Sequence, residues 1–165
     1  MTARDYQQWG QWISENPRPN TVIVDSSFVL TLLATPGRKV KACRKFVRAM
    51  TRDGAIVYMT EWTVNEVFHV IHARCGANRD EFKAVTDAAR RLLSTSKTFT
   101  VSADQVGAVR TAAVGLLVNR TSVIGITGAY TLASGRTEEA HFVGSDRGWH
   151  NITDVNVWVT STPRL

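Results

Sequence analysis

The sequence predicts an α/β protein, a three-layer α/β/α sandwich around a central parallel sheet. Short apolar segments alternate with longer segments of helical periodicity, as expected when helices cover a parallel sheet. The short segments are continuous and rich in β-branched residues, which is typical of buried parallel strands. Two of them end in an aspartate, Asp25 and Asp146. Active sites of such sheets lie at the carboxyl ends of the strands, so these positions also suggest where function resides.

Residues 1–18 are predicted to be an N-terminal helical extension, and residues 19–165 a single domain. Tyr6, Trp9 and Trp12 follow a helical spacing, which predicts a short amphipathic helix. The two prolines of ENPRPN end it, because proline breaks helices and favours extended chain. We expect the aromatic side chains to pack on the body of the protein. An interaction module built on them is the alternative.

The first half of the domain alternates strand and helix. TVIVD, residues 21–25, is a β-branched run typical of a buried strand. SSFVLTLL, residues 26–33, is predicted to be a helix with a serine cap. A second helix covers residues 36–50, and AIVYMT, residues 55–60, is the second strand.

Two longer helices follow, over residues 61–75 and 79–94. The apolar stripe of the first consists of Val64, Val67, Phe68, Ile71 and Cys75. The second is predicted to pack through Phe82, Val85, Ala89, Leu92 and Leu93. The remaining elements are expected to be a strand at 98–101, helices at 102–119 and 121–134, and strands at 141–146 and 155–159.

Composition favours a cytoplasmic protein with a polyanionic partner. The chain has 165 residues, a hydrophobic fraction of 44% and a formal charge of +6, values that suit one globular domain and make nucleic acid a plausible ligand. No apolar run approaches the ~20 residues of a membrane helix, and no signal peptide is recognisable at the N-terminus. Cys43 and Cys75 are the only cysteines, so a disulfide framework is not expected.

Three carboxylates are candidates for a metal site. Asp25 and Asp146 end strands, and their simpler roles are a helix cap and a turn residue. Glu66 lies on the 61–75 helix, away from its apolar stripe. Acids that crowd together raise one another's pKa unless a cation binds them. Mg²⁺ and Mn²⁺ prefer oxygen ligands and activate water at phosphodiesters, so a cluster of acids on a basic protein suits a nuclease.

Three segments resemble PIN domains. TVIVDSSFVLTLL resembles the opening strand and helix of that family, and NEVFHVI resembles its first internal helix with a Glu. HFVGSDRGWHNI, followed by VNVWV, resembles the closing region and last strand. The resemblance covers roughly residues 21–159, and the size of the chain is similar to that of VapC-type toxins of bacterial toxin–antitoxin pairs.

The resemblance implies a Mg²⁺- or Mn²⁺-dependent endoribonuclease. It carries the catalytic and metal-binding roles to Asp25, Glu66 and Asp146, with Ser27 and Ser145 as supporting hydroxyls. It also implies an RNA substrate, an antitoxin protein that inhibits the enzyme, and a homodimer.

One acid of the family pattern is missing. The family has a further Asp at the start of the helix before the closing strand, where this chain reads SVIGITGAYTLA, residues 122–133. The best overlay places Ile124 there, and no Asp or Glu occurs from Gln105 to Thr137. Thr127, about one turn along, is a weak substitute that would hold a water. We therefore expect a weakened or altered site. The alternative is a catalytically degraded PIN scaffold that binds RNA or a protein partner without cleaving.

Basic residues recur at helical spacing over residues 37–52. This pattern predicts a solvated helix face opposite a core face. The alternative is a surface that follows RNA phosphates; its candidate residues are Lys41, Arg44, Lys45, Arg48 and, beyond the last acid, Arg147.

Other sites are less well supported. The side chains of a possible zinc site are Glu66, His69, His72 and Cys75. Residues spaced three apart move gradually around a helix, however, and no second cluster supplies the remaining ligands. His141 and His150 are expected to be surface or near-site polar residues. No phosphate-binding loop or dinucleotide motif is present.

Overall fold

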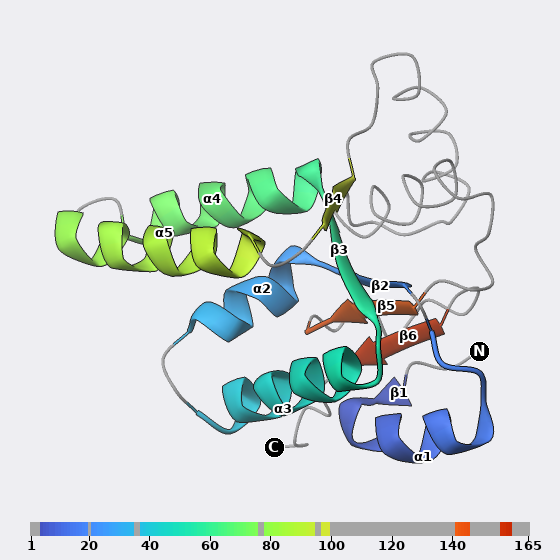
Figure 1. Ribbon diagram of the computed structural model, residues 1–165. Helices are drawn as coiled ribbons and strands as arrows, with labels where there is room; N and C mark the ends of the chain where they lie inside the picture. The colour runs from blue at the N-terminus through green and yellow to red at the C-terminus, as the bar shows by residue number, and fades with distance from the viewer. Residues whose placement is uncertain are drawn as a thin grey trace, which may run out of the picture.

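The parallel α/β class predicted from the sequence is confirmed (Figure 1). The computed structural model describes residues 4–19, 21–34, 37–75, 78–94, 97–99, 141–145 and 156–159. Within these ranges six strands form one sheet, in the order β1-β6-β5-β2-β3-β4, and every pairing is parallel. The strands are β1 (Arg4–Asp5), β2 (Thr21–Val24), β3 (Ile56–Thr60), β4 (Lys97–Phe99), β5 (His141–Gly144) and β6 (Asn156–Val159).

The described helices lie where the periodicity predicted them. They are α1 (Trp9–Glu15), α2 (Ser26–Leu33), α3 (Arg38–Arg52), α4 (Glu61–Cys75) and α5 (Arg79–Ser94), and a 3₁₀ helix, η1 (Tyr6–Gln8), precedes α1. Helix α2 packs against α3 and α4, and α4 packs against α5. The helices predicted over 102–119 and 121–134 fall outside the described residues. No helix in the described ranges is long and apolar enough to cross a membrane.

The strand order places a switch point beside β2. The chain leaves β2 toward β3 on one side of it, whereas β5 lies on the other side and is followed by β6. In open parallel sheets a crevice forms outside the carboxyl ends of two such strands. The carboxyl ends of β2 and β5 are therefore the expected location of a functional site.

The N-terminal segment is part of this sheet and of its core. Strand β1 pairs with β6, where Arg4 lies opposite Trp158. The ring of Tyr6 stacks on Phe46 with centroids 4.3 Å apart, and Trp9 meets Trp158 edge to face at 5.0 Å. We expected these aromatic side chains to pack on the body of the protein, and they do. No strand is predicted here from the sequence, because two residues with charged side chains carry no apolar pattern.

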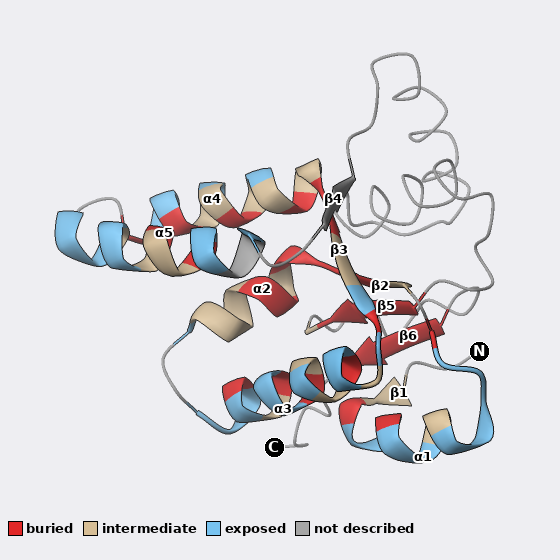
Figure 2. Cartoon of the chain, viewed as in Figure 1, coloured by how far each residue is buried: buried red, intermediate tan, exposed pale blue. Residues whose placement is uncertain are grey.

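Helix α3 is amphipathic in the way that its sequence predicts. Val40, Cys43, Phe46 and Met50 are buried against the rest of the molecule. The opposite side is exposed, and Figure 2 shows buried and exposed positions alternating along the helix. The exposed side carries Arg38, Lys39, Lys41, Arg44, Lys45, Arg48 and Arg52.

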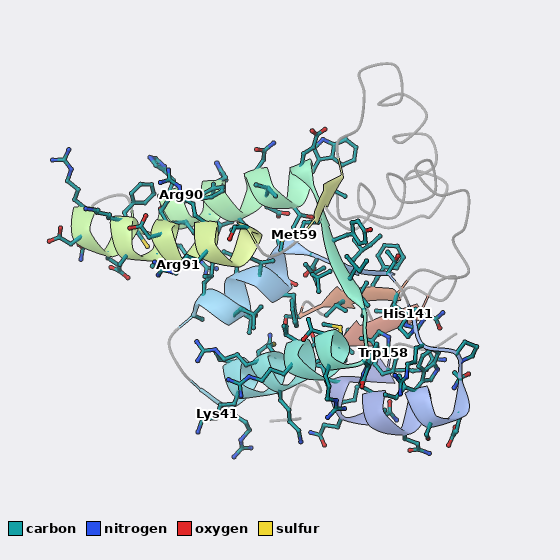
Figure 3. The ribbon with its side chains drawn as sticks, in the orientation of Figure 1. Lys41, Met59, Arg90, Arg91, His141 and Trp158 are labelled. Carbon is teal, nitrogen blue, oxygen red and sulfur yellow. The ribbon has the colours of Figure 1, made fainter. Side chains whose placement is uncertain are left out.

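The prediction that His141 is a surface or near-site polar residue is wrong. His141 is only 4% exposed and lies in β5. Its Nδ1 accepts a hydrogen bond of 2.9 Å from Trp158 Nε1, and Figure 3 shows the two side chains together near the sheet. The rings of Trp9 and Trp12 also contact it. A buried histidine is stable here because its Nδ1 accepts a hydrogen bond and its aromatic ring packs against the rings of Trp9 and Trp12.

Candidate functional site

Asp25 lies at the carboxyl end of β2, immediately before α2. It is 2% exposed, and its Oδ1 accepts a hydrogen bond of 2.8 Å from the Phe28 backbone N–H. This contact caps α2, which is the simpler role considered for Asp25. The predicted serine cap is wrong, because the capping side chain comes from the residue before the two serines. The Ser27 hydroxyl also lies 2.8 Å and 2.7 Å from the two carboxylate oxygens. The carboxylate is thus fixed in orientation by its own helix.

The carboxyl ends of β2 and β5 are joined by two hydrogen bonds. The Asp25 backbone N–H donates to the Val143 carbonyl at 3.0 Å. The Ser145 backbone N–H donates to Ser27 Oγ at 2.9 Å. These contacts bring Ser27 and Ser145 together. Asp146 follows Ser145 in the chain and lies outside the described residues.

Glu66 approaches the same region from α4. Its Oε2 accepts a hydrogen bond of 2.7 Å from the Ser26 hydroxyl, and its side chain is half-buried. Ser26 and Ser27 are neighbours in the first turn of α2, and each binds one of the two acids. Asp25 and Glu66 are therefore each one hydrogen bond from the same dipeptide. The sequence suggested Ser26 as a helix cap only, because no local pattern links it to a residue 40 positions away.

Three further side chains converge on the end of β5. Lys39 Nζ donates to the Ser145 carbonyl at 3.0 Å, and Tyr6 donates to the Gly144 carbonyl at 2.6 Å. Cys43 Sγ lies 3.8 Å from Ser145 Oγ. Burial raises the pKa of the Cys43 thiol, so this group is protonated at neutral pH. None of the three was a predicted site residue, since each comes from an element distant in the sequence.

The other predicted site residues divide into two groups. The basic candidates Lys41, Arg44, Lys45 and Arg48 are all exposed on α3 and make no salt bridge with another described residue. Thr127 and Arg147 fall outside the described residues, as does Ile124, where the family resemblance predicts a missing acid. The predictions for these three positions therefore stay predictions.

The donor atoms suit a hard divalent cation in kind. Asp25 and Glu66 offer carboxylate oxygens, and each accepts a hydrogen bond from a serine, which orients it without neutralising its charge. Mg²⁺ in proteins is often bound by only one or two carboxylates together with water and phosphate. Within the described ranges no group of three His, Cys, Asp or Glu side chains lies close enough to hold a metal. A site of three acids therefore requires an acid from outside the described residues, and Asp146 is the predicted one.

The same observation bears on the zinc alternative. His69 and His72 are exposed on α4, and the His72 ring lies edge-on to Phe82 at 5.9 Å. Since the described part of the chain holds no cluster of three metal-ligating residues, the Glu66, His69, His72 and Cys75 set is not assembled there as a zinc site.

Comparison with known proteins shows the fold. No family model matches the chain, and no curated protein matches it. VapBC2 from Rickettsia felis, in a structure bound to a DNA fragment from its promoter, gives a TM-score of 0.62 at 8% identity over 84% of this chain and 98% of the other.

Two more solved structures agree. VapC20 of Mycobacterium tuberculosis, a toxin that cleaves the sarcin-ricin loop, has a TM-score of 0.53 and 17% identity over 81% of this chain and 98% of its own. PAE2754 from Pyrobaculum aerophilum has a TM-score of 0.56 and 15% identity over 86% and 92%. The chain therefore has the PIN-like fold of VapC structures, as its sequence predicted.

Proposed function

We propose, from this PIN-like fold and the site at the ends of β2 and β5, that the protein is a Mg²⁺- or Mn²⁺-dependent endoribonuclease. The observation that supports it best is the arrangement of Asp25 and Glu66. Both acids are oriented by serines of one helical turn, at the switch point of a parallel sheet. Helix capping alone requires Asp25 but gives no reason for the Ser26–Glu66 contact.

In this proposal Asp25, Glu66 and Asp146 hold the metal ion. The ion would supply an activated water and stabilise negative charge at the phosphodiester. Ser27 keeps the Asp25 carboxylate in one orientation, and Ser26 does the same for Glu66. Burial of Asp25 limits competing water at that carboxylate. Such preorganised ligands bind a metal more tightly than mobile ones.

The absence of an acid near Ile124 leads us to propose a weakened site. Fewer carboxylates mean less negative charge and a lower affinity for the cation. Thr127 remains the proposed holder of a water at that position. We expect cleavage to require millimolar metal and to be slow. If the site binds no metal at all, the protein is the catalytically degraded scaffold, which does not cleave.

The structural neighbours support a proposal for the partners of this protein. One of them is VapBC2 bound to a promoter DNA fragment, and another is a toxin that cleaves the sarcin-ricin loop. We accordingly propose that this protein acts on RNA in the cytoplasm, as the toxin of a type II toxin–antitoxin pair. An antitoxin would be its inhibitor and a second copy of the chain its partner in a dimer.

Metal removal tests the proposed activity. The purified protein should cleave structured RNA in Mn²⁺ or Mg²⁺ and lose all cleavage in EDTA, with recovery when the metal is restored. Products are followed on denaturing gels. If RNA stays intact at millimolar Mn²⁺ while still binding in a salt-sensitive manner, the degraded scaffold is the correct account.

The exposed basic side of α3 is the proposed RNA contact. Lys41, Arg44, Lys45 and Arg48 span about 11 Å of helix, and Figure 3 shows Lys41 pointing away from the body of the protein. Lys39 on the same helix reaches Ser145 at the candidate site. Changing those four residues of α3 to glutamine should weaken RNA binding at least about tenfold at 0.1 M salt. It should also reduce the slope of log K against log salt by up to about 3.

Helix α5 offers a matched control for that measurement. It also carries four exposed cations, Arg79, Lys83, Arg90 and Arg91, two of which are labelled in Figure 3. Changing these four to glutamine removes the same charge from a helix that packs on α4 and α2 but carries no residue of the candidate site. Equal losses in the two variants would show that net charge, and not the α3 surface, drives binding.

A further inference from the structure

A chain of hydrogen bonds runs from the N-terminal segment to Asp25. We propose that Tyr6 is a positioning residue for the Asp25 carboxylate, acting through the Gly144–Ser145 peptide group and the Ser27 hydroxyl. The expected consequence of this positioning is a change in metal affinity, and that consequence rests on the proposed function. The chain of contacts itself is independent of that function.

Each link of this hydrogen-bond chain is short, and the first two links join segments that are far apart in the sequence. The Tyr6 hydroxyl in η1 donates to the Gly144 carbonyl at 2.6 Å. The N–H of the same peptide group belongs to Ser145 and donates to Ser27 Oγ at 2.9 Å. The Ser27 hydroxyl then lies 2.7 Å from Asp25 Oδ2 and 2.8 Å from Oδ1.

The donor direction is fixed along the whole chain. A backbone N–H only donates, so Ser27 Oγ is the acceptor from Ser145 and its own proton is free to point at the Asp25 carboxylate. The Gly144 carbonyl can only accept, so the Tyr6 hydroxyl is the donor in the bond between them. Hydrogen bonds aligned in one sense polarise one another, so donation by Tyr6 strengthens the Ser145 N–H as a donor. The positive end of the chain faces Asp25.

The environment of Tyr6 keeps it in this role. Burial raises the pKa of the Tyr6 hydroxyl, and the nearby Cys43 and Asp25 add to the increase, so the phenol stays protonated. Its ring stacks on Phe46 and meets Phe28 edge to face. The pairing of β1 with β6 fixes the backbone just before it. A tyrosine held so rigidly suits a defined hydrogen bond better than simple filling of the core.

Tyr6→Phe removes the first donor and keeps the ring. The Ser145 amide proton, observed by NMR in the metal-free protein, should move upfield and exchange faster with solvent, because its hydrogen bond to Ser27 weakens. Mn²⁺ affinity measured by calorimetry should fall roughly three- to tenfold, at or below the low end of the loss seen when a direct outer-shell partner is removed.

Two further variants separate positioning from stability. Trp9→Phe perturbs the same N-terminal segment by removing the Trp9 Nε1 bond to Asp53, and it should leave the Ser145 signal and Mn²⁺ affinity unchanged. Ser27→Ala breaks the hydrogen-bond chain, so adding Tyr6→Phe to Ser27→Ala should cause no further loss of affinity.

The outcomes are distinct. An unchanged Ser145 amide in Tyr6→Phe, or an equal further loss of affinity in the Ser27→Ala background, would overturn the role of Tyr6. A wild-type protein that takes up no Mn²⁺ refutes the proposed function instead, while the Ser145 amide still decides whether the chain of hydrogen bonds operates.

Discussion

Replacing Asp25 with asparagine is expected to lower metal-dependent RNA cleavage by at least about 100-fold, because a direct ligand should matter more than the outer-shell partners whose loss costs 10–100-fold. The substitution removes the negative charge and keeps the shape of the side chain. Asn is as good a helix N-cap as Asp, so the bond from the Phe28 N–H is retained. The change in the free energy of unfolding should therefore stay below about 1 kcal/mol.

Asp25→Ala serves as the contrast to Asp25→Asn. Alanine removes both the charge and the cap of α2, and its loss of stability should be about 1 kcal/mol. Cleavage assays and urea unfolding of the two variants separate the metal role from the capping role. A cleavage rate for Asp25→Asn within a few-fold of the wild type would leave Asp25 as a cap alone.

Acidification should destabilise the protein through His141. Burial, and to a smaller extent the charge of Arg4, lower the pKa of His141 to about 4. In the unfolded chain the pKa of a histidine is about 6.5. The unfolded state therefore binds the proton first, and stability is fully present above about pH 6.5 and falls as the pH decreases toward 4. Over this window the loss amounts to at most about 3 kcal/mol.

His141→Asn isolates this contribution. Asparagine does not titrate, and its Oδ1 can accept the hydrogen bond that Trp158 now donates to Nδ1. Urea unfolding at pH 7 and pH 4.5 should show the wild type losing about 2 kcal/mol more than the variant, since carboxylates contribute equally to both. Parallel pH dependences of the two proteins would mean that His141 is protonated without difficulty in the folded state.

Local patterns predicted most of the described architecture. The β-branched run of β2 and the apolar stripes of α3 and α4 place these elements within a few residues, because burial on a sheet demands such patterns. Strand β1 is different: Arg4 and Asp5 form a strand only because β6 offers an edge to pair with. The prediction that His141 is a surface or near-site residue was wrong for a similar reason, since its hydrogen-bond donor Trp158 is 17 positions away.

The candidate site also combines residues with a local sequence signal and residues whose contacts are distant in the sequence. Asp25 and Ser27 stand out because acids and hydroxyls at the carboxyl end of an apolar strand are unusual in a core and common in a site. The role proposed for Tyr6 has no such signal, because its contact with Gly144 joins residues 138 positions apart. Ser26 is comparable: its link to Glu66 exists only once α2 and α4 are packed together.

Calorimetric titration of Mn²⁺ into the wild-type protein and Asp25→Asn tests most directly whether the serine-bound acids form a metal site. We expect a saturable exothermic or endothermic signal for the wild type that weakens at least about 100-fold for the variant, since a direct ligand is lost. Asp146→Asn should weaken it as well, because that acid is the proposed third ligand. Identical heats for all three proteins would contradict the account.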